Sequence, residues 1–273
     1  LRQLASHTSG LPAWRPLYLT TGGERARTLE TIAAEPLEYS PGTQVLYSDL
    51  GFITLGLLLE RVTGNSLASL AREQLFEPLN LGRTFFNPAQ AWQTEMAACE
   101  LGNAYEREMC RADAERFQGW REQLIWGEVH DGNAHFLGGA AGHAGLFSDA
   151  RETLRLANQF LAGRTELLQP QTCALFRTNL TEGLAEARSF AWQLAATKDS
   201  TAGTSLPPDS FGHLGFTGTS CWIDPNGERT YILLTNRTHA RTPPFANINS
   251  TRRRFHTLAA AALDELSKPK ARS

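Results

Sequence analysis

The chain has 273 residues, of which 41% are hydrophobic and 20% charged, so it can bury a substantial core as one large domain or two lobes. Its net charge of −2 argues against a nucleic-acid partner, and no apolar stretch is long enough to span a membrane. The sequence begins at Leu1, without a methionine and within a helix-like pattern. We therefore consider that an N-terminal segment of the same protein is missing, and the localisation stays open.

The first part of the chain is predicted to be mainly helical. Residues 1–6 have the pattern of the last turns of a helix, which ends in His7-Thr8-Ser9-Gly10-Leu11-Pro12. A histidine at such an end most often hydrogen-bonds locally. A second helix runs from Ser48 or Asp49, either of which can cap it, to Gly64. It is apolar nearly all round, which predicts a central position in its lobe.

The middle of the chain is predicted to be rich in loops. Residues 87–123 lack a clear hydrophobic period, which indicates a long surface excursion. Residues 126–148 contain many small residues, so the backbone there must pack tightly. Four side chains of that segment are of metal-ligand type, but their spacing matches no standard zinc helix: His130, Asp131, His135 and His143. We expect hydrogen bonds that fix a loop, and no metal.

The last third of the chain is predicted to hold antiparallel strands. Residues 190–196 alternate in polarity, and residues 221–235 have the pattern of two strands around an Asn226-Gly227 turn. The preceding ten residues, 211–220, contain three glycines and three hydroxyls. They predict a rim strand whose N–H groups could hold a carbonyl oxygen, beside His213, Thr217 and Thr219. A glycine-rich strand with a bulge is the equally weighted alternative.

A C-terminal helix is predicted to open at Ser250 or Thr251 and to be followed by a frayed tail over residues 267–273. The cluster Arg252-Arg253-Arg254 at its start is expected to be a solvated face. The apolar positions are expected to point inward: Phe255, Leu258, Ala259, Ala262, Leu263 and Leu266. The predicted division is a mainly helical lobe over residues 1–185 and a lobe of strands plus this helix over residues 186–273.

The four cysteines have no Cys-x-x-Cys spacing, which argues against a zinc site. Cys99 and Cys110 bracket a short loop and could form a disulfide in an oxidising compartment. Free thiols are the favoured alternative.

Four segments together resemble the serine β-lactamase and penicillin-binding-protein-like hydrolases, on the class C side. They are residues 4–12, residues 47–52, residues 138–147 and His213-Leu214-Gly215-Phe216-Thr217-Gly218. The resemblance implies an α+β fold of the β-lactamase/transpeptidase type, in which a helical lobe packs on an antiparallel sheet with flanking helices. It implies that both lobes form one family domain, that N-terminal strands are missing from this chain, and that no cofactor is used.

The family's motifs imply roles for individual residues. Tyr47-Ser48-Asp49 resembles the Tyr-x-Asn motif, so Tyr47 would relay protons and Asp49 would orient that network. His213-Leu214-Gly215 resembles the Lys-Thr-Gly or His-x-Gly motif, with His213 assisting electrostatically or by hydrogen bonding. The N–H of Phe216 would be an oxyanion donor. Thr217, Gly218 and Thr219 would line the substrate groove.

This sequence departs from the family pattern at its motifs. Asp49 stands where asparagine is usual, and a carboxylate cannot donate a hydrogen bond to a substrate amide carbonyl, which argues against efficient β-lactam hydrolysis. His213 and Leu214 favour the esterase and peptidase-like members. The Ser-x-x-Lys motif of the nucleophile is matched only by Ser267-Lys268-Pro269-Lys270, which we interpret as chance. We therefore expect that the chain alone forms no acyl-enzyme. We also expect residues 230–235 to be an unpaired apolar edge that makes the chain marginally folded.

The predicted function is that of a serine hydrolase that cleaves an amide or ester carbonyl of a small-molecule or peptide substrate through an acyl-enzyme. Tyr47, Asp49 and His213 are then expected to converge on one cleft. One alternative is an inactive family member that binds peptidoglycan or protein. The other is a metal-dependent hydrolase that uses His130, Asp131 and His143.

Overall fold

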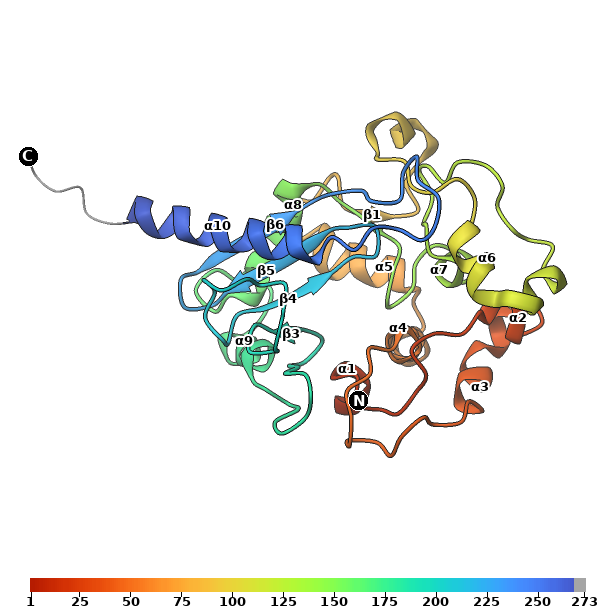
Figure 1. The fold of residues 1–273 in the computed structure, drawn as a ribbon, viewed down its shortest axis with the longest axis horizontal. Helices are drawn as coiled ribbons and strands as arrows, with labels where there is room; N and C mark the ends of the chain where they lie inside the picture. The colour runs from red at the N-terminus through yellow and green to blue at the C-terminus, as the bar shows by residue number, and fades with distance from the viewer. Residues whose placement is uncertain (268–273) are drawn as a thin grey trace, which may run out of the picture. The chain divides into compact units, whose positions relative to one another are not determined.

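The computed structural model describes residues 1–267, which separate into two compact units (Figure 1). Unit 1 comprises residues 1–156 and 236–245, and unit 2 comprises residues 157–235 and the chain from Ala246 onward. The expected boundary between residues 185 and 186 stays a prediction. Lys268–Ser273, and with them most of the Ser-x-x-Lys match and of the expected frayed tail, lie outside the described residues. No helix within residues 1–267 combines the length and the hydrophobicity needed to cross a membrane.

Unit 1 consists mainly of helices, with one short two-stranded sheet in which β1 pairs antiparallel with β2. Short 3₁₀ turns at Arg25–Arg27, Gln90–Glu95 and Arg111–Arg116 and a π-helical turn at Arg72–Phe76 complete it. In chain order its elements are α1 (Arg2–Ala5), α2 (Leu17–Thr20), α3 (Thr28–Ala33), α4 (Asp49–Thr63), α5 (Leu67–Ala71), β1 (Phe85–Phe86), α6 (Ala104–Cys110), α7 (Gly132–Phe136), β2 (Leu146–Phe147) and α8 (Ala150–Ala157), which ends one residue into unit 2.

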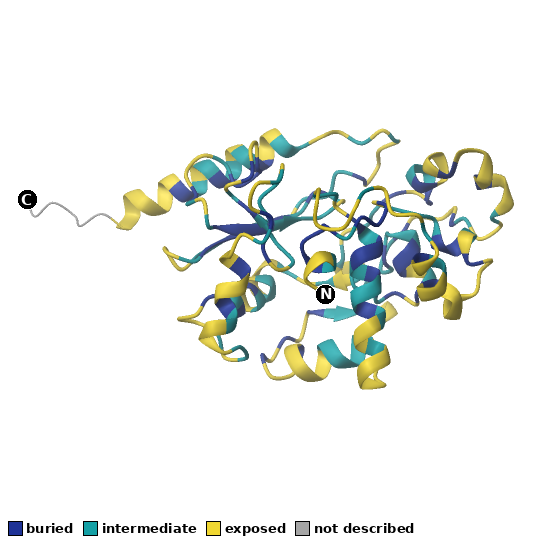
Figure 2. Ribbon diagram, turned by 90° about the horizontal axis from the view of Figure 1, so that it is seen from below, coloured by how far each residue is buried: buried dark blue, intermediate teal, exposed yellow. Residues whose placement is uncertain are grey.

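Helix α4 begins and ends as its sequence predicts, and only its first half is central. The Ser48 hydroxyl accepts a hydrogen bond from the Gly51 N–H, and Gly64 ends the helix in the left-handed conformation. Leu50 and Ile53 are buried in the core of unit 1. The end of the helix is exposed, up to 76% at Val62, so the expectation of a helix buried all round is wrong for its last turns (Figure 2).

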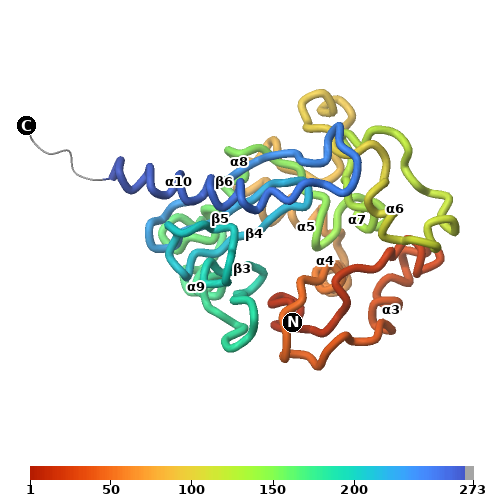
Figure 3. The backbone as a smooth tube through the Cα atoms, in the orientation of Figure 1, coloured from red at the N-terminus to blue at the C-terminus, as the bar shows by residue number. Residues whose placement is uncertain are grey.

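The segment from 87 to 123 contains more structure than its composition predicts. Helix α6 forms in it, and the Glu106 side chain accepts hydrogen bonds from the Tyr18 hydroxyl and the Gly132 N–H. The returning segment 236–245 reaches the same region, where Asn236 donates to the Ala98 carbonyl and Phe245 stacks on Tyr105 at 5.8 Å between ring centroids (Figure 3). Such long-range contacts leave no local period in a sequence.

Unit 2 is built on a four-stranded antiparallel sheet in the order β3-β4-β5-β6. Its elements are a 3₁₀ turn at Asn158–Phe160, α9 (Pro170–Arg177), β3 (Gln193–Leu194), β4 (Phe211–Leu214), β5 (Ser220–Asp224), β6 (Arg229–Leu233) and α10 (Asn249–Ser267). The predicted hairpin is confirmed, since β5 and β6 pair around the expected turn. The strand expected over residues 190–196 shortens to β3. Within residues 1–267, β6 is the terminal strand of this sheet, and α10 packs against it.

The two faces of this sheet have separate cores. Phe211 and its cross-strand partner Ile223 pack with Phe176 of α9, whereas Trp222 and its partner Tyr231 pack with Ala260 of α10. This alternation follows the pleat of the strands. An α+β fold is therefore confirmed, with helices beside antiparallel sheets.

The inward face of α10 differs from the expected one. Its buried positions are Arg252, His256 and Ala260, which are spaced four residues apart and so share one helix face. Leu266 of the expected inward set is 81% exposed. The cysteine prediction is confirmed in its favoured form, because all four thiols are free.

Candidate active site

The segment around Tyr47 is held in place by the turn at His7. The His7 carbonyl accepts a hydrogen bond from the Leu46 N–H at 2.9 Å, and its ring Nδ1 accepts one from the Ser48 N–H at 3.0 Å. The ring also stacks against Tyr47, with 4.5 Å between centroids. The expected local hydrogen bond of His7 is thus replaced by one to a residue far along the chain. This contact fixes the backbone on both sides of Tyr47.

Tyr47 and Asp49 form a hydrogen-bonded pair at the start of α4. Ser48 caps the helix and donates to the Pro12 carbonyl at 2.7 Å, so Asp49 becomes the first helical residue. The Asp49 carboxyl is hydrogen-bonded to the Tyr47 side chain. Burial raises its pKa to about 6, although the nearby His143 counteracts this. The Tyr47 side chain is 39% exposed and so is open to a ligand.

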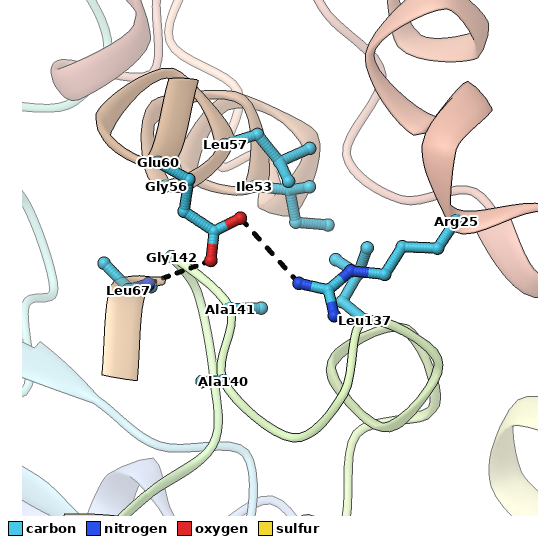
Figure 4. A pocket seen from close by; sticks show the side chains of 10 residues that line it. All are labelled: Arg25, Ile53, Gly56, Leu57, Glu60, Leu67, Leu137, Ala140, Ala141 and Gly142. Carbon is cyan, nitrogen blue, oxygen red and sulfur yellow. Dashed lines mark hydrogen bonds and ion pairs between the residues drawn. The ribbon is translucent and has the colours of Figure 1, made fainter. Parts of the chain in front are cut away.

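A tight hairpin tip packs directly on the face of α4 that carries Asp49. Ala141 and Ala144 exchange backbone hydrogen bonds, which places Gly142 and His143 at the tip. A methyl group on Gly142 would meet the Phe52 carbonyl oxygen at 1.9 Å. Figure 4 shows this loop against α4, beside a pocket in which Arg25 and Glu60 form an ion pair at 3.7 Å. The tight packing that the small residues predict is therefore confirmed.

His143 lies between two carboxylates. Its Nε2 is 2.9 Å from the Asp131 Oδ1, and its side chain is only 3% exposed. A carboxylate oxygen of Asp49, a carboxylate oxygen of Asp131 and a ring nitrogen of His143 all lie within 4.8 Å of one another. The pKa of His143 is raised by the charge and the hydrogen bond of Asp131 and by the charge of Asp49, which outweigh its burial. Both carboxylates therefore favour the charged form of the imidazole.

The histidine-rich loop is fixed by hydrogen bonds, as the sequence predicts. His130 Nε2 lies 2.8 Å from the Glu100 carboxylate. Asp131 caps α7 by accepting from the Ala134 N–H at 2.7 Å, and Arg121 donates to the carbonyls of Val129 and His130. Asp49, Asp131 and His143 all have hydrogen-bond partners within the protein. The three thus form a hydrogen-bonded group, and the expected absence of a metal there stays a prediction.

The second motif of the resemblance lies in unit 2, at the end of β4. His213 and Leu214 are the last residues of the strand, and a tight turn follows, closed by the Gly215 N–H to the Thr219 carbonyl at 2.8 Å. Phe216 lies in this turn and is 41% exposed. Gly218 has a φ of +121°, a backbone conformation that residues other than glycine rarely adopt. The predicted strand is confirmed as β4, and the approach of a ligand to its backbone stays a prediction.

His213 is held neutral. Burial and the charge of Arg188 lower its pKa to about 4. Its Nδ1 lies 2.9 Å from the Leu214 carbonyl, which can only accept, so Nδ1 carries the proton. A neutral ring differs in this respect from the cationic side chain of a lysine.

Arg252 holds the turn that carries Phe216. It is buried, and it donates to the carbonyls of Gly215 and Thr219 at 2.8 and 2.9 Å and to that of Gly218 at 3.2 Å. The expectation that residues 252–254 form a solvated face is wrong for Arg252, because three carbonyls satisfy its guanidinium. Sequence reasoning missed this residue. The sequence signal that could have found it is its spacing of four residues from His256, which is buried on the same face of α10.

A second buried pair of unit 2 joins a serine to a histidine. The Ser220 hydroxyl is 2.9 Å from His256 Nε2, and both residues are buried. Burial lowers the pKa of His256 to about 4, so the ring stays neutral. Because a substrate cannot reach the Ser220 hydroxyl, this pair is structural and is not a nucleophile with its base.

Comparison with known proteins identifies the family. The model of the β-lactamase family matches residues 1–252. The chain belongs to the β-lactamase family. A protein of Escherichia coli K12 named "Putative D-alanyl-D-alanine carboxypeptidase" is 34% identical over 254 residues, which cover 88% of this chain and 57% of that protein. The chain thus spans little more than half the length of this relative.

Solved structures share the fold of this chain. A β-lactamase from Mycobacterium bovis matches with a TM-score of 0.62 at 18% identity, covering 98% of this chain and 74% of its own. Simvastatin synthase from Aspergillus terreus matches with a TM-score of 0.64 at 18% identity, covering 96% and 68%. The resemblance read from four sequence segments and the β-lactamase/transpeptidase-like fold are both confirmed. The roles of the individual site residues stay predictions.

Proposed function

We propose that this chain supplies the proton-relay and oxyanion parts of a serine hydrolase that cleaves an amide or ester carbonyl through an acyl-enzyme. The observation that carries the proposal is the hydrogen-bonded Tyr47–Asp49 pair, which lies in a segment anchored by His7 and leaves the tyrosine ring partly exposed. A relay residue needs both a fixed backbone and access to the substrate. Tyr47 has both.

The motif at His213 supplies the complementary function. The turn that follows His213 is rigid, since Arg252 donates to three of its carbonyls. A rigid turn allows a backbone N–H, that of Phe216, to stabilise an oxyanion without reorganisation during the reaction. We propose that His213 hydrogen-bonds in this network as a neutral ring, and that Thr217, Gly218 and Thr219 bind the substrate.

A peptide ending in D-alanyl-D-alanine is the substrate class that we propose first, because relatives carry the name of such a carboxypeptidase. A β-lactam is the less favoured substrate. Asp49 is ionised above pH about 6 and then cannot donate to the substrate amide as asparagine does. Small esters remain in the same reaction class.

The test uses the protein as its gene encodes it and the 273-residue chain side by side. Both are incubated with a fluorescent penicillin and with a fluorescent phosphonate, and release of D-alanine from the peptide is measured. We expect covalent labelling and D-alanine release in the gene-encoded protein and no labelling of the 273-residue chain. Labelling of the chain alone, abolished by heat denaturation, would contradict the expected lack of a nucleophile in it.

The Tyr47→Phe variant of the gene-encoded protein tests the relay. We expect kcat/KM to fall by about 10²–10⁴, as loss of a general acid–base group does. The ring contact with His7 is kept, so the fold should be unchanged. Tyr105→Phe, which keeps its stacking on Phe245, is the matched control. Wild-type protein that shows no labelling and binds peptidoglycan would favour the inactive binding module instead.

A further inference from the structure

The Asp49 carboxylate has an unusual neighbourhood for a residue that hydrogen-bonds to Tyr47. A second carboxylate, Asp131, lies within 4.8 Å of it. Two carboxylates so close repel each other, and each favours protonation of the other. The imidazole of His143 is within the same distance of both, and it is the group that can neutralise this repulsion.

The fold holds His143 at this place from two sides. On one side the backbone of Gly142 packs closely on α4. A Cβ atom added to Gly56 of α4 would lie only 2.9 Å from the Gly142 nitrogen. Since Gly56 lies seven residues after Asp49, the two share one face of α4. On the other side Asp131 accepts from both the Ala134 N–H and His143, so Asp131 is fixed as the cap of α7.

We propose that Asp131 and His143 are positioning residues for Tyr47. With Asp49 they form a carboxylate–imidazolium–carboxylate group that keeps Asp49 ionised, so that Asp49 accepts the hydrogen bond of the Tyr47 hydroxyl. This inference rests on the proposed function.

The charge on Asp49 decides the direction of that hydrogen bond. An ionised carboxylate can only accept, so the Tyr47 proton points to Asp49 and the lone pairs of the phenol oxygen are left for the substrate side. A protonated carboxyl can donate to the phenol oxygen and would then occupy a lone pair. When Tyr47 takes a proton from the substrate side, its own hydroxyl proton must pass to Asp49, and only the ionised carboxylate can receive it. His143 therefore controls, through Asp49, whether Tyr47 can relay a proton.

Other charged groups around the cluster act in known directions. His130 lies beside Asp131 and helps to keep it ionised. Glu106 strengthens the proton affinity of His143, while its own pKa is raised to about 7 by burial and by Asp131. Because the pKa values of Glu106 and Asp49, about 7 and about 6, lie close together, the measurement must resolve the individual carboxyl groups.

The first experiment is an NMR titration of the gene-encoded protein with ¹³C-labelled aspartate side chains. The signal that disappears in the Asp49→Asn variant is assigned to the Asp49 carboxyl. In His143→Gln, an amide can still donate to Asp131 but carries no charge. We expect the midpoint of Asp49 to rise by about 1 pH unit or more. In Asp131→Asn, which retains a good cap for α7, we expect the midpoints of both Asp49 and His143 to fall.

The opposite shifts separate an electrostatic role from a structural one, because loss of packing would move Asp49 in the same direction in both variants. His135→Gln is the control, since His135 is half-exposed and pairs with Glu128 at 3.6 Å. It should leave the Asp49 midpoint unchanged. An Asp49 midpoint that does not move in His143→Gln overturns the proposal.

The second experiment measures the pH profile of kcat/KM of the gene-encoded protein. The acidic limb should shift upward in His143→Gln by the same amount as the NMR midpoint, and Tyr47→Phe should remove the difference between the two proteins. An unshifted limb in an active His143→Gln variant overturns the positioning role. Shifted NMR midpoints in a protein without hydrolase activity would instead contradict the proposed function and leave the charged group standing.

Discussion

The effect of a single residue on the free energy of unfolding depends on its surroundings in the fold. Asp49 illustrates this, because burial opposes its ionisation while Tyr47 and His143 favour it. Its pKa in the folded state is about 6, above the ordinary value near 4. The ionised form therefore lowers the free energy of unfolding at neutral pH, and the cost disappears below pH about 4, where folded and unfolded states both bind the proton.

The Asp49→Asn variant should be more stable than the wild type at neutral pH. Its side-chain oxygen still accepts from Tyr47, and no charge has to be buried. We expect the free energy of unfolding to rise by roughly 1–3 kcal/mol near pH 7 and by nothing near pH 4. Urea unfolding at both pH values checks this. A gain that is equal at the two pH values would show that packing, not ionisation, is responsible.

Arg252→Gln should destabilise the protein because the carbonyls of Gly215, Gly218 and Thr219 each lose a charged donor, although each keeps one other hydrogen bond. A hydrogen bond to a charged group contributes about 1.5–3 kcal/mol, so we expect a loss of about 2 kcal/mol. Arg254→Gln, an exposed position on the same helix, should change stability by no more than about 0.5 kcal/mol. Thermal unfolding of the two variants compares them directly. Equal Tm values for both variants would contradict the role given to Arg252.

At the scale of elements, the packing of the hairpin tip on α4 depends on glycine. Gly142→Ala places a methyl group 1.9 Å from a backbone oxygen of α4, which cannot move away cheaply. We expect a loss of about 1–3 kcal/mol or more. The control is Gly82→Ala, where no atom lies within 4 Å and φ is not positive. Urea unfolding measures both, and a tolerated Gly142→Ala would mean that the tip is not rigidly packed.

The elements differ in how far the sequence predicts them. Helix α4 is marked by its cap at Ser48 and its stop at Gly64, and the hairpin of β5 and β6 by its Asn-Gly turn, because these signals are local. Helix α6 is not predicted, since its buried Glu106 is satisfied by Tyr18 and Gly132, which are remote in sequence. The inward face of α10 is mispredicted for the same reason. Its arginine and histidine are buried only because carbonyls and a serine of other segments receive them.

The candidate site divides in the same way. Tyr47, Asp49 and His213 are found from short motifs with fixed spacing. His143 and Asp131 also attract attention, but as metal-type side chains on a loop. No pattern within the loop shows that they face Asp49, since that contact depends on how Gly142 meets α4. The predicted cleft shared by Tyr47, Asp49 and His213 stays a prediction.

At the scale of the whole molecule, the two units should respond to acid in opposite directions. In unit 1 the raised pKa values of Asp49 and Glu106, about 6 and about 7, make their contribution most favourable at low pH, and it is lost as pH rises through these values. In unit 2 the lowered pKa values of His213 and His256, both about 4, favour folding above pH about 6.5. That contribution is lost as pH falls toward 4.

Hydrogen exchange followed by mass spectrometry at pH 7 and pH 5, corrected for intrinsic rates, tests this expectation. Protection of peptides from β5 and α10 should decrease at the lower pH, while protection of peptides from α4 should hold or increase. His256→Gln should reduce the loss in unit 2, because one neutral buried histidine is removed. Parallel changes in both units would contradict the assignment of these groups.

The return of residues 236–245 to unit 1 sets an order for events during protein synthesis. In this segment Asn236 donates to the Ala98 carbonyl and Phe245 stacks on Tyr105 of α6, and it is translated only after all of residues 157–235. At 5–20 residues per second these intervening residues take roughly 4–16 s to make. During that time the ribosome holds a nascent unit 1 that still lacks its final piece. A stalled or truncated message ending before residue 236 would therefore release unit 1 unfinished, in a form that invites chaperone binding and proteolysis.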